Sequence, residues 1–442
     1  MTRLNVLKLS HLGFAGAALR THEGAPAVPV GAEAQLRRAV LACLLWEDQF
    51  YEDGVTIAER IAGLVPRVEP AMVAALAVEA REQFKLRHAP LLLVREAARY
   101  ATHRAVVAET LARVIQRADE LAEFLAIYWK EGRQPLAAQV KKGLAAAFSK
   151  FDAYALAKYD REGMVKLRDV LFLTHAKPLT ADQALTWRQL IDGTLPSPET
   201  WEVRLSRGEQ KREVWESLLM ENRLGALALL RNLRNIQAAG VEPELVRHAL
   251  EAIRVERVLP FRFIAAARHA PQWELWLERA MFQSLYGQAV LPGRTVLLID
   301  VSGSMDAPLS GRSQMLRIDA AAGLAVLLRE VAEGVAVYTF SDQVVRVPAR
   351  RGFALRDAIV QSQPHNGTYL GRALDELREA YDRLIVITDE QSHDRVPAPR
   401  GRGYVVNVAS YRNGVGYGAW THIDGWSEAV IEYIRSHERM DS

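Results

Sequence analysis

A buried strand that ends in a cluster of oxygen-bearing side chains constrains the fold of this chain most. Residues 295–299 are five consecutive apolar or β-branched residues, which is typical of a buried strand in a parallel sheet. Asp300, Ser302 and Ser304 follow at alternate positions, and Gly303 lets the loop turn sharply enough for the three oxygens to converge. The pattern predicts an α/β sheet with a polar site at the carboxyl end of this strand.

Two later segments complete the oxygen cluster. Residues 366–368 (Asn-Gly-Thr) are predicted to form a turn, and residues 383–389 (R-L-I-V-I-T-D) a second buried strand that ends in an acid. Hydroxyl and carboxylate oxygens without Cys or His are the usual ligands of a hard divalent cation. We therefore predict a site for Mg²⁺, with Mn²⁺ and Ca²⁺ as alternatives.

Helical spacing dominates the chain from residue 32 to about 290. Short connections that contain proline or glycine break the pattern. Many short helices joined in this way predict stacked helix pairs, an α-solenoid of HEAT-like repeats. The expected helices are 32–48, 54–64, 70–84, 90–102, 104–116, 118–131, 135–150, 163–174, 181–191, 209–219, 222–235, 243–255, 260–270 and 273–287.

The C-terminal third alternates between strands and helices instead. Pro292-Gly293 marks the predicted change of domain, so we expect a multidomain chain with a helical module at 1–290 and an α/β domain at 291–442. The alternation predicts a doubly wound, Rossmann-like sheet that binds ligands outside the carboxyl ends of its strands. The expected strands are 295–299, 334–341, 384–388 and 403–409, and the expected helices are 317–332, 354–362, 370–381 and 426–437.

Basic side chains are concentrated in the helical half. The net charge is only +3, but residues 130–177 contain ten basic and five acidic residues. A surface of this kind attracts nucleic-acid phosphates by releasing counterions, and its binding weakens with salt. Phe151, Tyr154 and Tyr159 in the same window are candidate stacking surfaces for unpaired bases. The alternative is that these lysines only solubilise helix faces.

The oxygen cluster resembles the metal-ion-dependent adhesion site of von Willebrand factor A domains. The motif is D-x-S-x-S, then a turn threonine and a strand-terminal T-D, and the likeness extends over roughly residues 290–440. The resemblance implies that the hydroxyls bind the cation, while the aspartates act directly or through water. With only two carboxylates, the ion keeps an open coordination position for an anionic group of a partner. The implied ligands are Asp300, Ser302, Ser304, Thr368 and Asp389.

The chain as a whole resembles the Ro RNA-binding autoantigen family, which combines a TROVE module with a von Willebrand factor A domain. The similar segments are T-H-E-G-A-P-A from Thr21, T-H-A-K-P from Thr174, W-R-Q-L-I-D-G-T-L-P from Trp187, W-E-S-L-L-M-E-N-R-L-G from Trp215, L-P-F-R-F from Leu259 and D-V-S-G-S-M from Asp300. The resemblance implies a ring of helical repeats. Its outer basic surface would bind small noncoding Y RNAs, and its hole would take single-stranded ends of misfolded RNAs.

Matching by motif assigns two Y-RNA contacts of the family to this chain. They are Lys158 in A-K-Y and His175 in T-H-A-K-P. Neighbouring basic residues are further candidates because of their charge, although Glu162 stands where the family often has another basic residue. The predicted RNA-binding residues are Lys141, Lys142, Lys158, Arg161, Lys166, Arg168, His175 and Lys177.

These patterns together predict a non-enzymatic, monomeric RNA-binding scaffold of Ro type, acting in RNA quality control or processing. Its partners would be Y-RNA-like RNA, single-stranded RNA 3′ ends and an exoribonuclease or another protein at the cation. The alternative is a metal-dependent adhesion or complex-assembly module with a helical scaffold. A hydrolase is the weakest interpretation, because the sequence offers no nucleophile or general base.

The same sequence leads us to expect a cytoplasmic protein. No apolar run approaches the ~18 residues of a membrane span, and the first residues do not resemble a signal peptide. The single cysteine, Cys43, lies in an apolar run and is expected to be a buried side chain. We expect the same of Trp187, Trp215, Trp273 and Trp276, which follow helical apolar patterns and are therefore core residues rather than stacking platforms.

Overall fold

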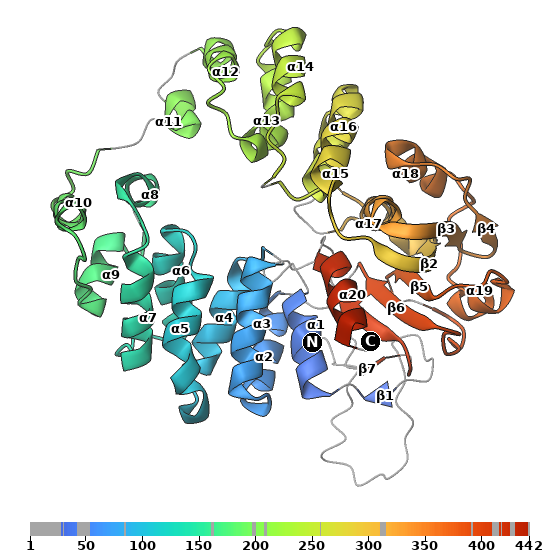
Figure 1. Ribbon diagram of the computed structural model, residues 1–442, viewed down its shortest axis with the longest axis horizontal. Coiled ribbons are helices and arrows are strands. Elements are labelled where there is room, and N and C mark those ends of the chain that lie inside the picture. Colours follow the sequence, from blue (N-terminus) through green and yellow to red (C-terminus); the bar gives the residue numbers. More distant parts are fainter. Residues whose placement is uncertain are drawn as a thin grey trace. The chain divides into compact units, whose positions relative to one another are not determined.

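The computed structural model describes residues 28–29, 31–41, 54–83, 85–160, 163–196, 200–206, 210–256, 258–309, 315–389, 392–408, 415–416, 418–424 and 429–440. The chain forms two compact units (Figure 1). One comprises residues 32–40 and 55–204, and the other comprises residues 1–31, 41–54 and 205–442. We call them the helical unit and the sheet unit. The predicted ring concerns how these units are placed relative to each other and stays a prediction.

The helical unit is built from short helices stacked in two rows. Helices α3, α5 and α7 pack side by side, and α4 and α6 form a second row behind them (Figure 1). Gly143 allows α7 to lie close to α5, because a Cβ at this position would come within 2.8 Å of the Ala108 carbonyl oxygen. The helices are α1 (Ala32–Leu41), α2 (Gly54–Leu64), α3 (Pro70–Glu82), α4 (His88–Ala97), α5 (Arg104–Val114), α6 (Asp119–Tyr128), α7 (Ala138–Phe148), α8 (Ala153–Tyr159), α9 (Leu167–Thr174), α10 (Ala181–Asp192) and α11 (Trp201–Ser206), with 3₁₀ turns η1 (Val65–Arg67) and η2 (Ala101–His103).

The predicted solenoid of helical repeats is confirmed, but two of its helices were missed. Helices α8 and α11 have seven and six residues, too few for a clear period in the sequence. The helix predicted at 163–174 begins only at Leu167, and the described part of the helix predicted at 32–48 is Ala32–Leu41. Cys43 and the T-H-E-G-A-P-A segment lie outside the described residues.

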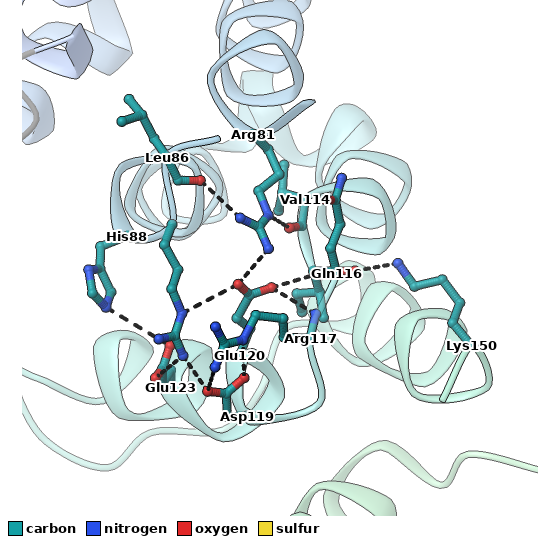
Figure 2. A network of polar contacts seen from close by, with 12 residues as sticks. Arg81, Leu86, His88, Val114, Gln116, Arg117, Asp119, Glu120, Glu123 and Lys150 are labelled. Carbon is teal, nitrogen blue, oxygen red and sulfur yellow. Dashed lines mark hydrogen bonds and ion pairs between the residues drawn. The ribbon is translucent and has the colours of Figure 1, made fainter. Parts of the chain in front are cut away.

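A buried carboxylate links helices α3, α5 and α6 at the turn between α5 and α6. Glu120 is fully buried and accepts hydrogen bonds from the backbone N–H groups of Gln116 (2.8 Å) and Arg117 (3.0 Å). It also accepts one from the guanidinium of Arg81 (2.6 Å), which itself donates to the Val114 carbonyl oxygen (2.9 Å) (Figure 2). The network therefore fixes the position of this turn.

Replacing Glu120 with alanine should lower the free energy of unfolding by about 3–5 kcal/mol, because the buried Arg81 charge would lose its partner. Glu123→Ala in the same helix is the comparison variant, and it should cost less because the Arg87–Glu123 pair is partly exposed and Arg87 keeps Asp119 as a partner. Urea denaturation monitored by circular dichroism measures both variants. Equal effects of the two substitutions would contradict the central role of Glu120.

The sheet unit contains five further α-helices before its sheet. They are α12 (Lys211–Met220), α13 (Ala226–Ala238), α14 (Pro243–Glu251), α15 (Phe261–His269) and α16 (Glu274–Leu285), with the 3₁₀ turn η3 (Pro271–Trp273). Helices α15 and α16 pack against α17 (Arg317–Glu330) and α18 (Gly352–Val360). The compact units divide near residue 205, and the domain boundary predicted at residue 290 stays a prediction.

Tryptophan side chains in these helices pack in the core, as predicted. Trp187 in the helical unit, and Trp215 and Trp273 in the sheet unit, are 2–8% exposed. Trp276 is half-buried and donates its ring N–H to Glu251 (3.3 Å). None of the four is a free stacking surface.

The six-stranded sheet has the order β4-β3-β2-β5-β6-β8, and its neighbours are parallel except for the β3–β4 hairpin. This confirms the predicted doubly wound fold. The strands are β2 (Leu291–Asp300), β3 (Ala332–Phe340), β4 (Val344–Arg346), β5 (Arg383–Thr388), β6 (Arg402–Asn407) and β8 (Thr421–Asp424), while β1 (Val28–Pro29) pairs with β7 (Val415–Gly416). The short strands β4 and β8 were not predicted.

Helices cover both faces of this sheet. Helix α19 (Leu370–Glu376) packs on the face that carries Val296 and Leu298. On the opposite face Arg383 of β5 forms a buried ion pair with Glu438 of α20 (Ala429–Met440). Pro292 and Gly293, predicted to separate two domains, are the second and third residues of β2. The register of β2 with β3 shifts at this point.

Across the described parts of the chain, every helix is too short or too polar to cross a membrane.

Candidate functional site

Lys141 and Lys142 lie near the start of α7, on the sides of the helix that do not pack against α5. Val140, Gly143 and Leu144 form its buried face, so Lys142 is exposed and Lys141 is half-buried. Neither lysine side chain has a hydrogen bond or an ion pair within the described residues. The predicted basic surface is therefore present on this helix.

Helix α9, which packs on α7, carries the next group of predicted residues. Lys166 caps its start, with its backbone N–H donating to Asp169 (2.9 Å). Arg168 is exposed in the first turn, and His175 ends the helix in the left-handed conformation (φ 52°). Lys177 is exposed just beyond.

Three alternate helix connections lie at the same end of the helical unit. Lys150, which follows α7, donates to the Ala112 carbonyl oxygen (2.6 Å) at the end of α5. Gln183, in the first turn of α10, donates to the Ser149 carbonyl oxygen (2.8 Å) at the end of α7. The connections α5–α6, α7–α8 and α9–α10 are therefore aligned, which brings the segment with His175 and Lys177 beside the end of α7.

Lys158 is placed at this end by an aromatic side chain. Its Nζ lies 5.8 Å from the centre of the Tyr159 ring, and the guanidinium of Arg117 lies 4.9 Å from the same ring. Arg117 belongs to the α5–α6 turn that Glu120 fixes, and it also pairs with Asp119 (2.9 Å). Arg117 was not predicted, because the sequence places it 41 residues before Lys158.

Not every basic or aromatic residue of the window is available to a ligand. Lys150 is held by carbonyl oxygens at the end of α5, and burial lowers its pKa. The Phe151 side chain is only 8% exposed, whereas Tyr154 is 56% exposed. Arg161 and Glu162 lie outside the described residues.

The five predicted metal ligands converge at the carboxyl ends of β2 and β5. Asp300 ends β2 fully buried, accepting from the backbone N–H of Ser302 (2.9 Å) and from the hydroxyl of Thr388 (2.6 Å). The hydroxyl oxygens of Ser302 and Ser304 lie 3.3 Å apart, close to the spacing of about 3 Å between adjacent ligands on an octahedral ion with bonds near 2.1 Å. The donor set fits a hard cation.

The threonine turn reaches the same place through backbone contacts. The N–H of Gly303 donates to the Asn366 carbonyl oxygen (2.9 Å), so the 302–304 loop and the 366–368 turn touch. Thr368 is buried, and the Ser341 hydroxyl, which donates to the Gly367 carbonyl oxygen (3.1 Å), fixes the turn. Ser304 is half-buried while Gly303 and Asn366 are exposed, so the site opens to solvent on this side.

A buried arginine accompanies the metal ligands. Arg317, the first residue of α17, donates to the Asp389 carboxylate (3.0 Å) and to the Ser304 carbonyl oxygen (3.2 Å). It lies 72 residues before Asp389 in the chain, and nothing in the local sequence distinguishes it from the other arginines. The structure alone identifies it as part of this site.

The carboxylates of Asp300 and Asp389 lie close enough for their negative charges to repel each other. Burial, followed by the negative charge of Asp389, raises the pKa of Asp300 to about 7. Hydrogen bonds from Ser302 and Thr388 act in the opposite direction but do not offset burial. A cation beside these groups would favour the ionised form of Asp300.

Comparison with known proteins agrees with the fold described above. Residues 192–284 match the TROVE domain family. The resemblance to the Ro family is supported over this segment and at the level of the fold. The Ro (RSR) protein of Deinococcus radiodurans has a crystal structure similar to this chain, with a TM-score of 0.63, 19% sequence identity and coverage of 90% of this chain and 97% of that one. At this identity the similarity to Ro concerns the fold.

Telomerase protein component 1 is a further relative. The proteins of Mus musculus and Rattus norvegicus are 40% and 38% identical to this chain over 78 residues. These matches cover 16% of this chain but only 3% of each telomerase component. The similarity therefore concerns one segment of much longer proteins.

The TROVE match and the basic residues occupy different parts of the chain. The match begins at the end of α10 and ends within α16, whereas the predicted RNA-binding residues precede it. The Ro-type fold extends over both regions, but the assignment of Lys158 and His175 as RNA contacts stays a prediction.

Proposed function

We propose that this protein is an RNA-binding scaffold of Ro type, and that the basic surface of its helical unit holds the RNA. The observation that carries this proposal is a set of basic side chains with no acidic partner among the described residues. They lie on neighbouring helices, at the two ends of α9 and along α7. The set is Lys141, Lys142, Arg168, His175 and Lys177.

Some arginines elsewhere in the protein differ in this respect. Arg99 pairs with Glu131, Arg212 with Glu216, and Arg247 with Glu244. Such pairs neutralise the positive charge locally, so little positive electrostatic potential remains to attract a polyanion. The lysines and the arginine of the unpaired set keep their charge, so RNA phosphates can replace their counterions with a gain in free energy.

We propose the finer details on the same basis. The RNA would be a small structured noncoding RNA resembling a Y RNA, together with single-stranded 3′ ends, and the protein would act in RNA quality control without catalysing a reaction. Recognition would depend on shape and charge more than on sequence. Lys158 and His175 would be central contacts.

A second proposed function belongs to the oxygen cluster of the sheet unit. Its donor set and its solvent-exposed side fit a bound Mg²⁺, held by Asp300, Ser302, Ser304, Thr368 and Asp389. When bound, the ion would offer an open coordination position to the carboxylate of a protein partner, such as a nuclease. Mn²⁺ and Ca²⁺ are the alternative ions.

The RNA proposal is tested by direct binding. A labelled RNA hairpin with a single-stranded 3′ tail should bind the full chain, and a plot of log Kd against log salt should have a slope of about 3–4, reflecting about five phosphate contacts. Fluorescence anisotropy with and without EDTA separates this activity from the metal site. Absence of binding even at low salt would refute the proposal.

A further inference from the structure

Helix α9 displays an aromatic side chain on its solvent face. Phe172 is 57% exposed, while Leu167, Val170 and Leu171 form the buried face of the helix. Burying a phenylalanine is worth about 1.5–3 kcal/mol, so leaving this one exposed forgoes that stabilisation. Phe172 has no aromatic partner and no cation over its ring within the described residues.

Basic residues precede and follow Phe172 along the helix. Arg168 precedes it by four residues, which places the two side chains one above the other. His175 follows one turn later at the end of the helix. Neither Arg168 nor His175 has a hydrogen bond or an ion pair among the described residues. An aromatic ring thus lies between two groups that can hold phosphates.

This stripe suits one nucleotide of an unpaired strand. The rise from Arg168 to Phe172 is about 6 Å, at 1.5 Å per residue, which is comparable to the separation of a phosphate and the base attached to it. Bases in a duplex are stacked on each other and present only their edges, whereas an unpaired base can lie flat on a ring. The charge beside the ring favours a nucleic acid over an apolar protein segment.

We propose that Phe172 is a stacking platform for an unpaired RNA base, with Arg168 and His175 holding the adjoining phosphates. This inference rests on the proposed RNA-binding function and assigns a base-stacking contact to the single-stranded segments of the RNA. The contribution of Phe172 is apolar, so it should be independent of salt, unlike that of the basic residues.

The test compares two RNA probes by fluorescence anisotropy with the full chain. One is a single-stranded oligouridine of about 12 nucleotides, and the other is a blunt RNA duplex of about 16 base pairs. Phe172→Ala should weaken binding of the single strand about 5- to 100-fold and leave the duplex and the salt dependence unchanged. Phe172→Tyr should restore single-strand binding, whereas Phe172→Leu should not.

Leu185→Ala is the matched control, because Leu185 is equally exposed (59%) on the neighbouring α10 but is not aromatic. It should leave both affinities unchanged. If wild-type protein binds the probes and Phe172→Ala binds the single strand equally well, the stacking inference fails while the proposed function stands. The inference also fails if Phe172→Leu retains full affinity, since that result would show a general apolar contact with the RNA rather than ring stacking. If wild-type protein binds neither probe, both proposals fail.

Discussion

Replacing Lys142, Arg168 and Lys177 together with alanine should weaken RNA binding about 50-fold at physiological salt. The three side chains are exposed and lie in or next to α7 and α9. Each phosphate contact releases about 0.7 of a counterion from a single strand, so the slope of log Kd against log salt should fall by about two. Affinity at high salt should change much less.

The matched control removes the same charge from other places. Arg99, Arg212 and Arg247 are replaced by alanine, which lowers the net charge of the protein equally. Because each of these arginines is paired with a glutamate, the control should lose less than about threefold in affinity and keep its salt slope. If both triple variants lose affinity equally, net charge rather than the α7–α9 surface governs binding.

Mg²⁺ should stabilise the wild-type protein strongly at pH 8 and weakly at pH 5.5. In the absence of the ion, the raised pKa of Asp300 means that the folded state binds a proton more tightly than the unfolded state does. The contribution of Asp300 to stability is therefore most favourable below pH 4 and declines as the pH rises to about 7, by up to about 4 kcal/mol. Mg²⁺ binds the ionised form, so its affinity should fall about tenfold per pH unit below 7.

Asp300→Asn is the variant that separates these effects. It imitates the protonated carboxyl group, so it should raise the Tm of the metal-free protein at pH 8 and abolish the response to Mg²⁺. Thermal denaturation with Mg²⁺ or EDTA at the two pH values measures both quantities. A wild-type Tm that ignores Mg²⁺ at pH 8 would refute the metal site.

Arg317→Gln provides a companion to that experiment. Without the guanidinium, the buried Asp389 carboxylate loses its counter-charge, and the metal-free protein should be destabilised at pH 8. Mg²⁺ should restore more stability to this variant than to the wild type, because the ion no longer competes with a neighbouring positive charge. A smaller response than in the wild type would show that Arg317 instead orients Asp389 for the ion.

Much of the fold could be predicted from the sequence. Long helices with a clear apolar period and strands such as β5, which are apolar throughout, specify their own type. The missed elements are short for their type: helices α8 and α11 have seven and six residues, and strands β4 and β8 have three and four. In elements this short, packing against neighbours rather than the local pattern decides the conformation.

The candidate sites likewise have features that the sequence predicts and features that it does not. The positions of Ser302 and Ser304 relative to Asp300 follow from the sequence, because ligands within five residues of one loop have little freedom. The availability of the lysines did not follow from it, since Lys150 and Lys142 look equivalent in the chain. Only the folded protein directs Lys150 to the end of α5 and leaves Lys142 without an acidic partner among the described residues.

The sequence alone thus determined the helical repeats, the doubly wound sheet and the ligand chemistry of the oxygen cluster, since all are encoded in residue types at short spacing. The tertiary structure decided which charged groups are neutralised. Arg317 meets Asp389, and Arg117 meets Tyr159, across 72 and 42 positions of the chain. Contacts over such separations depend on how helices and strands pack, and no local pattern records them.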